Sequence, residues 1–135
     1  MIRFVVDAST ALSWCFPDEA AAFPTEEAMA TVPAVWPLEV ANGLLMGERR
    51  GRITLAQVTR LAELLLAALE VQVDHASDAF KDVLPIAREH RLSVYDAACL
   101  ELAIRRDLPL ATGDGKLADA ARKCGVELFG KLEKA

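Results

Sequence analysis

The sequence lacks the features that define several large classes of protein. Its 135 residues contain no apolar run near the roughly 18–20 residues of a membrane-spanning helix. The opening stretch MIRFVV is too short for a secretory signal peptide. Its three cysteines are scattered without metal-type spacing, which favours a reducing compartment over a disulfide framework. We therefore expect a cytoplasmic protein.

Positive charge is also in short supply, because the formal net charge is −5. Proteins that coat DNA or RNA are basic, since neutralisation of phosphates supplies most of their affinity. The composition therefore excludes a generic nucleic-acid-coating protein. An acidic protein can still act on nucleic acid when its carboxylates converge on metal ions, which reverse the local electric field.

No glycine-rich phosphate loop follows the first apolar run. Histidine is also scarce in this sequence. The two histidines are His75, after a strand-like run, and His90, near the predicted end of a helix. Ribonuclease chemistry without a metal needs a general acid and a general base, often a histidine pair. A favourable interaction with the helix dipole accounts for His90 equally well. We expect no catalytic role for either residue.

What the chain does contain is an alternation of short apolar runs and helical patterns. The runs typical of strands are 2–6, 34–36, 70–73, 108–112 and 126–129. The helical patterns are 11–16, 19–30 with an interruption at Pro24, 37–49, 54–68, 78–90 with a kink or restart at Pro85, 93–106 and 115–125. This alternation predicts an α/β fold with a parallel sheet covered on both faces. Because no linker or repeat is present, residues 1–130 are expected to form a single domain and 131–135 a C-terminal tail.

The first strand-like run ends on an acidic residue, Asp7. A simple explanation is that Asp7, Ser9 or Thr10 caps the next helix by accepting hydrogen bonds from free backbone N–H groups. Ligands of open α/β sheets, however, bind outside the carboxyl ends of the strands. Asp114, in LPLATGDGK, stands at a second strand end, so the two acids could be close in space.

Four acids share the property of interrupting or ending an apolar segment. They are Asp7 in FVVDAST, Glu39 in WPLEVANGL, Asp96 in SVYDAACLELA and Asp114 in LATGDG. Taken one at a time, Asp7 and Asp114 could be helix caps, and the other two could complement helix dipoles. Neither role requires acids flanked by Leu, Val, Tyr and Ala, and acids are rarely buried without partners. Together they therefore favour one site.

A cluster of carboxylates stays ionised only when a cation is present. Oxygen ligands select hard cations, so Mg²⁺ or Mn²⁺ is the natural guest. Neutral oxygens nearby would come from Ser9, Thr10, Asn42 and Thr112. Such a site suits metal-assisted attack of water on a phosphodiester. Lys116 and the arginines at 49, 50 and 52 could contact substrate phosphates, although a solvated face is the default interpretation of such charges.

The segments VVDASTAL, PLEVANGL, LSVYDAACLELA and LATGDGKLADAA resemble, in order and spacing, the motifs of PIN-domain ribonucleases, most closely VapC-type toxins of toxin–antitoxin systems. The resemblance implies a three-layer α/β/α sandwich and an endoribonuclease that depends on Mg²⁺ or Mn²⁺. It implies that Asp7, Glu39, Asp96 and Asp114 are the metal-binding and catalytic residues, and that Ser9, Asn42 and Thr112 lie beside them at the substrate. It also implies a homodimer and a VapB-type antitoxin as partner.

Two alternatives stay open at this point. VVDAST and GDG are also similar to haloacid dehalogenase-like phosphatases, but those enzymes need a second Asp where this sequence has Ser9. The other alternative is a protein-binding, PIN-like adaptor without nuclease activity. Its candidate surface is formed by Leu12, Trp14 and Phe16 and by the nearby segment GLLMGERRGR, although most such residues belong to a core.

Overall fold

A parallel sheet forms the centre of the structure, a computed structural model that describes residues 1–16, 19 and 27–129. Within these residues the sheet has four strands in the order β3-β2-β1-β4. The strands are β1 (Ile2–Val6), β2 (Ala28–Pro33), β3 (Leu69–Asp74) and β4 (Leu110–Ala111). Every neighbouring pair is parallel, which confirms the predicted fold class.

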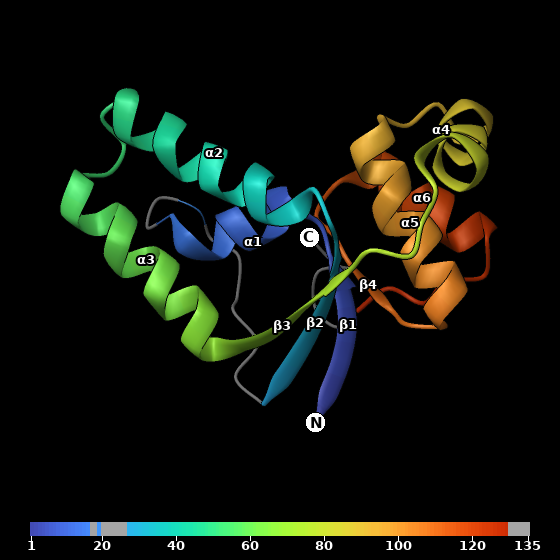
Figure 1. The fold of residues 1–135 in the computed structure, drawn as a ribbon, viewed down its shortest axis with the longest axis horizontal. Coiled ribbons are helices and arrows are strands. Elements are labelled where there is room, and N and C mark those ends of the chain that lie inside the picture. Colours follow the sequence, from blue (N-terminus) through green and yellow to red (C-terminus); the bar gives the residue numbers. More distant parts are fainter. Residues whose placement is uncertain (17–18, 20–26, 130–135) are drawn as a thin grey trace.

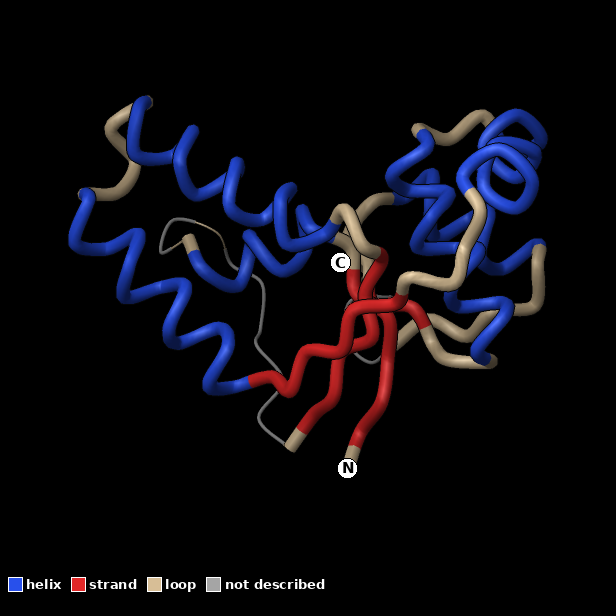
Figure 2. Tube along the Cα trace, viewed as in Figure 1, coloured by secondary structure: helices blue, strands red, loops and turns tan. Residues whose placement is uncertain are grey.

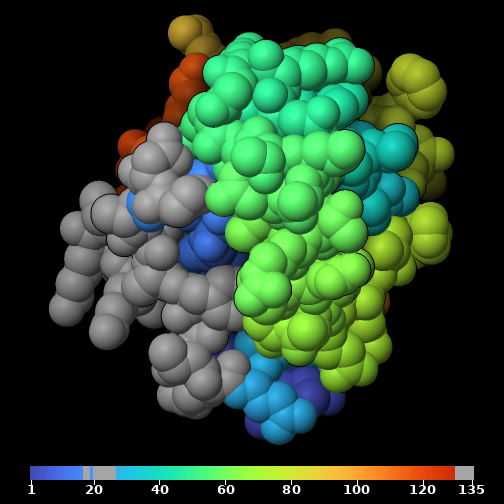
Figure 3. All heavy atoms as spheres, turned by 90° about the vertical axis from the view of Figure 1, so that its left-hand side faces the viewer, coloured from blue at the N-terminus to red at the C-terminus, as the bar shows by residue number. Residues whose placement is uncertain are grey.

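Helices cover the sheet on both faces and complete a three-layer arrangement (Figure 1, Figure 2). One layer contains α1 (Ala8–Cys15), α2 (Trp36–Arg49) and α3 (Leu55–Ala68). The other contains the π-helical turn η1 (Ala79–Val83), α4 (Leu84–His90), α5 (Val94–Arg106) and α6 (Gly115–Lys123). Figure 3 shows α2 and α3 side by side on the outside of the first layer. Among the described residues, no helix combines the length and apolarity needed to cross a bilayer.

The strand β1 lies inside the sheet and divides the core into two parts. Its residues Phe4, Val5 and Val6 are fully buried. Phe4 and Val6 pack into the cluster under α1, α2 and α3, whereas Val5 packs with Leu100 and Leu117 under α5 and α6. Successive side chains of a strand point to opposite faces, so a continuous apolar run suits a strand that is covered on both sides.

Close packing of α1 against α2 depends on two glycines. A Cβ atom on Gly43 would lie 2.2 Å from Leu12 Cδ1, and one on Gly47 would lie 2.7 Å from Phe16 Cε1. Phe16 is buried, and Leu12 and Trp14 pack partly buried against the same core. Phe16 is therefore a core residue, and Leu12 and Trp14 contribute to the same core, so these three side chains do not form an exposed patch.

Local sequence signals account for the helices that were predicted well. Thr54 caps α3, and Thr54 and Gln57 exchange side-chain and backbone hydrogen bonds of 3.2 and 2.8 Å in a capping box. Pro37 lies in the first turn of α2 as expected. Pro85 lies at the start of α4, where the π-helical turn gives way to an α-helix.

The prediction for the second strand was wrong. Residues 28–33 form β2, not the end of a helix over 19–30, and residues 34 and 35 turn into α2 instead of forming a strand over 34–36. Ala28, Met29 and Ala30 favour helices in isolation, but here they are buried between β1 and β3. Pairing on both sides overrides that preference. The interruption at Pro24 lies outside the described residues.

The last predicted strand is also shorter than expected. Of residues 126–129, only Leu128 forms a bridge, with Leu110 of β4. The expected strand over 108–112 is reduced to Leu110 and Ala111. The tail proposed for 131–135 lies outside the described residues.

Candidate active site

The four acids singled out from the sequence all stand at helix N-termini. Asp7 is the N-cap of α1 and Asp114 the N-cap of α6, and each accepts a backbone hydrogen bond of 2.9 Å. Glu39 and Asp96 lie in the first turns of α2 and α5. The simple capping explanation is therefore correct for Asp7 and Asp114. Because α1, α2 and α6 follow the carboxyl ends of β1, β2 and β4, three of these acids share that edge of the sheet (Figure 1).

A threonine hydroxyl joins the first acid to the last. Thr112 Oγ1 donates a 2.5 Å hydrogen bond to Asp7 Oδ2 and accepts one of 3.0 Å from the backbone N–H of Asp114. Thr10 Oγ1 accepts a further hydrogen bond of 3.0 Å from the backbone N–H of Gly113. Asp7, Thr10 and Thr112 are all buried. These bonds fix the loop after β4 against the start of α1, so Asp7 and Asp114 have defined positions.

The carboxylates act on one another electrostatically. Burial raises the pKa of Glu39, and the negative charges of Asp96 and Asp7 raise it further. Burial likewise raises the pKa of Asp96, with further contributions from Asp7 and Asp114. In the described part of the chain, no lysine or arginine forms an ion pair with any of the four acids. The edge therefore carries negative charge that these described residues do not neutralise.

A thiol lies in the same field and is too deeply buried to react. Cys99 is 2% exposed. Burial raises its pKa well above the ordinary value, and the charges of Asp7, Glu39 and Asp96 add to this effect. Only the thiolate is a good nucleophile. Cys99 is thus a core residue.

The donor chemistry of the edge fits a hydrated divalent cation. Among the described residues, no group of three or more histidine, cysteine or acidic side chains is arranged to hold a metal ion by itself. Mg²⁺ does not require one, because it keeps several waters and usually binds one or two carboxylates. A cation placed among these acids would also remove the mutual repulsion that raises the pKa values of Glu39 and Asp96.

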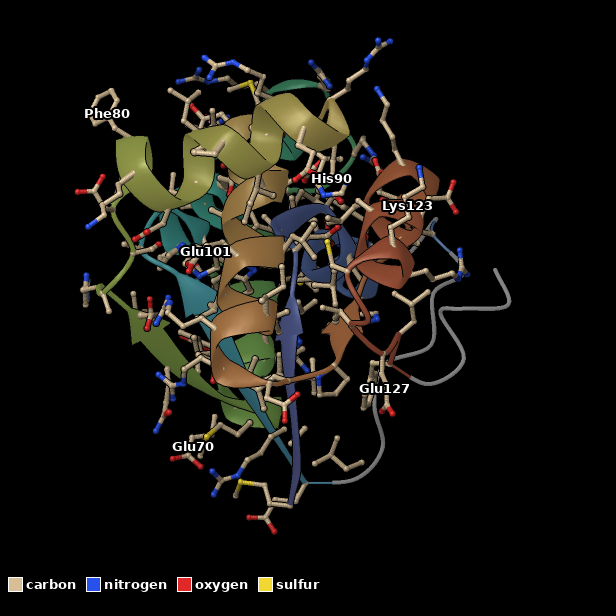
Figure 4. The ribbon with its side chains drawn as sticks, turned by 90° about the vertical axis from the view of Figure 1, so that its right-hand side faces the viewer. Glu70, Phe80, His90, Glu101, Lys123 and Glu127 are labelled. Atoms are coloured by element: carbon tan, nitrogen blue, oxygen red, sulfur yellow. The ribbon has the colours of Figure 1, made fainter. Side chains whose placement is uncertain are left out.

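The neutral and basic residues expected near the acids have different surroundings. Ser9, Asn42 and Lys116 are exposed, in the early turns of α1, α2 and α6. Lys116 lines a pocket of about 310 Å³ together with His90 and Lys123. Figure 4 shows His90 and Lys123 next to each other on α4 and α6. Lys116 lies next to the helix start that Asp114 caps, and the acids Glu89 and Asp119 also line the pocket, so its charge is mixed.

The arginines predicted to approach substrate lie elsewhere. Arg49 stands about 15 Å along α2 from Glu39, at the rise of an α-helix. Arg52 covers the Phe16 ring at 4.1 Å and pairs with Glu19 at 3.1 Å. That end of α2 is therefore engaged with the core of the first helical layer, away from the acids.

Two features of this region were not among the predicted site residues. Thr10 was noted as a nearby hydroxyl, and its spacing of three from Asp7 is the capping signal that places it at the site. Asp74, at the end of β3, forms ion pairs with Arg105 and Arg106. No local pattern indicates that pairing, because β3 and α5 are brought together only by the fold.

Comparison with known proteins identifies the class. Residues 4–123 match the PIN domain, and the chain belongs to the PIN-domain family. It is 30% identical over 124 residues to Ribonuclease VapC3 of Pyrobaculum aerophilum, a match that covers 87% of this chain and 94% of that protein. The crystal structure of PAE2754 from the same organism superposes with a TM-score of 0.64 at 25% identity, covering 88% of this chain and 79% of that one. The predicted resemblance is confirmed, and the phosphatase alternative belongs to a different family.

Proposed function

We propose that the protein is an endoribonuclease toxin of VapC type that depends on Mg²⁺ or Mn²⁺. The observation that carries the proposal is the set of four acids at one edge of the sheet, with no cationic side chain of the described residues paired to them. Similarity to a protein named as a VapC ribonuclease supports the same activity. The acids alone would explain metal binding, and the similarity adds RNA as the substrate.

Asp7, Glu39, Asp96 and Asp114 would hold the cation. When bound, it would lower the pKa of a water molecule, orient the scissile phosphate and stabilise charge on the leaving oxygen. The chain's own contribution is positional. Thr112 and the amide N–H of Thr10 hold both oxygens of Asp7, which fixes the direction of its remaining lone pairs. In-line attack by water leaves 5′-phosphate and 3′-hydroxyl ends and does not use the 2′-hydroxyl.

Substrate contacts are proposed for the exposed polar residues around the acids. The Lys116 ammonium and the Asn42 amide would donate hydrogen bonds to phosphate oxygens, as would the hydroxyl of Ser9. Thr112 would serve the substrate indirectly, because its hydroxyl is already engaged by Asp7 and Asp114. The pocket that contains Lys116, His90 and Lys123 offers room for a neighbouring phosphate.

The proposal includes partners as well as substrate. A homodimer and a VapB-type antitoxin are expected from the similarity to Ribonuclease VapC3. An antitoxin would inhibit the enzyme by covering the acidic edge, and a basic side chain on it would complement the charge there. Such a toxin and antitoxin pair would act in the cytoplasm.

The direct test uses purified protein, stripped of any bound partner, on a mixed RNA pool with Mn²⁺ or Mg²⁺. Cleavage should disappear with EDTA and in the Asp7→Asn, Asp96→Asn double variant. Glu63→Gln, which changes an exposed acid on α3, serves as the matched control and should cleave normally. Calorimetric titration with Mn²⁺ should show binding to the wild type and to the control but not to the double variant. A folded protein that neither cuts RNA nor binds Mn²⁺ would favour the protein-binding adaptor instead.

A further inference from the structure

An apolar pocket of about 230 Å³ lies at the start of α5, the helix that carries Asp96. Three of its wall segments are 33–35 at the end of β2, 74–79 at the end of β3 and 94–98 at the start of α5, and Val83 of η1 completes the lining. We propose that this apolar pocket receives one unstacked base of the RNA whose phosphate the acids hold. This inference rests on the nuclease function proposed above and adds a determinant of sequence preference.

Two residues that line the pocket are close in sequence to acids of the edge. Val35 is the N-cap of α2, and its carbonyl accepts a 3.1 Å hydrogen bond from the backbone N–H of Glu39. Tyr95 is followed directly by Asp96. The proposal places a nucleotide adjoining the scissile phosphate in this pocket, beside the first turns of α2 and α5.

The lining has the composition of a site for a flat, mostly apolar group with polar edges. Val35, Val83 and Val94 supply aliphatic surface, and Tyr95, which is 54% exposed, supplies an aromatic ring. Single-stranded RNA is recognised largely by bases that stack on aromatic side chains. The volume falls below the roughly 300–1,000 Å³ of pockets for drug-sized ligands, so it suits one ring system.

The wall of the apolar pocket also carries polar groups that can meet a ligand. Among the described residues, no side-chain hydrogen bond or ion pair involves His75, Ser77 or the Tyr95 hydroxyl. An apolar pocket with a few convergent polar groups is the usual form of a small-ligand site. The imidazole and the hydroxyls can both donate and accept hydrogen bonds, as the edge of a base requires.

Charge does not oppose RNA at this position. The pocket's carboxylate, Asp74, forms ion pairs of 2.6 Å with Arg105 and 3.5 Å with Arg106, and it also accepts a hydrogen bond from the backbone N–H of Ala76. Asp74 itself therefore adds little unbalanced negative charge to the apolar pocket. A neutral base can occupy it while the phosphate beside it faces the cation.

The first test measures binding without cleavage. Adenosine, guanosine, cytidine and uridine are titrated in EDTA, and the methyl signals of Val35, Val83 and Val94 are followed by NMR. We expect concentration-dependent shifts at these methyls, with one nucleoside preferred. Tyr95→Ala should raise Kd about tenfold, the scale of one base–aromatic stack, whereas Tyr95→Phe, which keeps the ring and loses only the hydroxyl, should raise it less. Phe80→Ala removes an aromatic ring that is 82% exposed and projects away from the molecule, so it is the matched control (Figure 4).

The second test follows cleavage of an RNA pool that is randomised around the cut. Tyr95→Ala should raise KM with little change in kcat and should flatten the base preference at one position, while Phe80→Ala cleaves as the wild type does. If nucleosides shift the methyl signals but the protein cuts no RNA, base binding in the pocket is supported and the nuclease function is rejected. If the protein cuts RNA normally, the methyl signals do not shift and Tyr95→Ala leaves the base preference unchanged, the nuclease function is supported and base binding in the pocket is overturned.

Discussion

Helix α5 contributes to two groups of carboxylates. One group is paired with arginine side chains, and the other has no cationic partner among the described residues. Asp96, in the first turn, faces Asp7, Glu39 and Asp114, and no cationic side chain of the described residues pairs with any of them. Further along the helix, Glu101 accepts a 2.9 Å hydrogen bond from Arg105 Nε. The same guanidinium donates to Asp74 at the end of β3. We call the second group the Arg105 cluster; it comprises Asp74, Glu101, Arg105 and Arg106.

The pKa shifts record the difference. Hydrogen bonds from Arg105 hold the pKa of Asp74 below its ordinary value, and the bonds to Glu101 and Asp74 raise the pKa of Arg105. The pKa values of Glu39 and Asp96 are instead raised, first by burial and then by neighbouring negative charge. In the Arg105 cluster the acids stabilise the fold, and they are paired with an arginine of the same chain. Within the described ranges the acidic edge has no such partner, which leaves its charge available for a cation from outside.

The largest effect is expected from a substitution in the acidic edge itself. Asp96→Asn should lower RNA cleavage at least about 100-fold, since even residues that only support a metal ligand contribute up to about that factor. Thermal stability should not fall, because the change removes a charge that repels its neighbours. Cleavage rates and melting curves measure both. Asp107→Asn, which alters an exposed acid just after α5, should change neither. A loss of less than tenfold at Asp96 would contradict a ligand role.

The converse change breaks the Arg105 cluster. Arg105→Met should lower the free energy of unfolding by about 2–3 kcal/mol, because two largely buried carboxylates lose their charged donor. Urea unfolding measures this loss. Arg122→Met removes an exposed arginine paired with Asp119 at 3.0 Å and should cost no more than about 0.5 kcal/mol. Equal losses in the two variants would show that the cluster is no more than a surface ion pair.

An intermediate effect is expected where a hydroxyl supports the acidic edge. Thr112→Val removes the donor to Asp7 and the acceptor for the amide of Asp114. Cleavage should fall about tenfold and stability by about 1–2 kcal/mol. Thr112→Ser keeps the hydroxyl and should retain most of both. If Val and Ser behaved alike, the hydroxyl would have no positioning role.

The smallest expected effect is a dependence of stability on pH that arises from Asp74 in the Arg105 cluster. Because the folded-state pKa of Asp74 is lowered, the folded protein binds a proton there less readily than the unfolded chain does. The resulting stability is present above the ordinary value of about 3.9 and is lost as pH falls through the lowered pKa. The groups facing Asp74 are Arg105 and Arg106, which stay charged throughout this range.

Asp74→Asn should therefore be less stable than the wild type at neutral pH, with the difference shrinking below about pH 4. Unfolding curves collected between about pH 3 and pH 7 measure this difference. A difference that stays constant across the range would mean that ionisation of Asp74 contributes nothing to stability.

The parts of the fold that depend on neighbouring residues were predictable from the sequence. Thr54 and Gln57 define the start of α3, and Pro37 defines the start of α2. The strand β2 was missed because its Ala and Met residues favour a helix locally, and its pairing partners Ile2 and Leu69 lie far away in the sequence. Non-local pairing is the information that a local pattern does not contain.

The candidate site shows the same division. Acids that interrupt apolar segments are visible in the sequence, so Asp7, Glu39, Asp96 and Asp114 could be selected from the amino-acid pattern alone. Thr112 was expected at the substrate, but its hydroxyl is taken up by Asp7 and Asp114. The apolar pocket was invisible, because its wall segments come together only in the folded chain. Chemistry that one residue carries can be predicted, whereas cavities depend on tertiary contacts.

The hydrogen bond from Thr112 to Asp7 also bears on when the protein can become active. It joins residues that are 105 positions apart, and β4, the last strand, pairs directly with β1, the first. Ribosomes extend a chain at about 5–20 residues per second, so several seconds separate the appearance of the two partners. During that time the first acid has been made but its counterpart has not. A nascent chain therefore cannot assemble the acidic edge until β4 and Asp114 have left the ribosome.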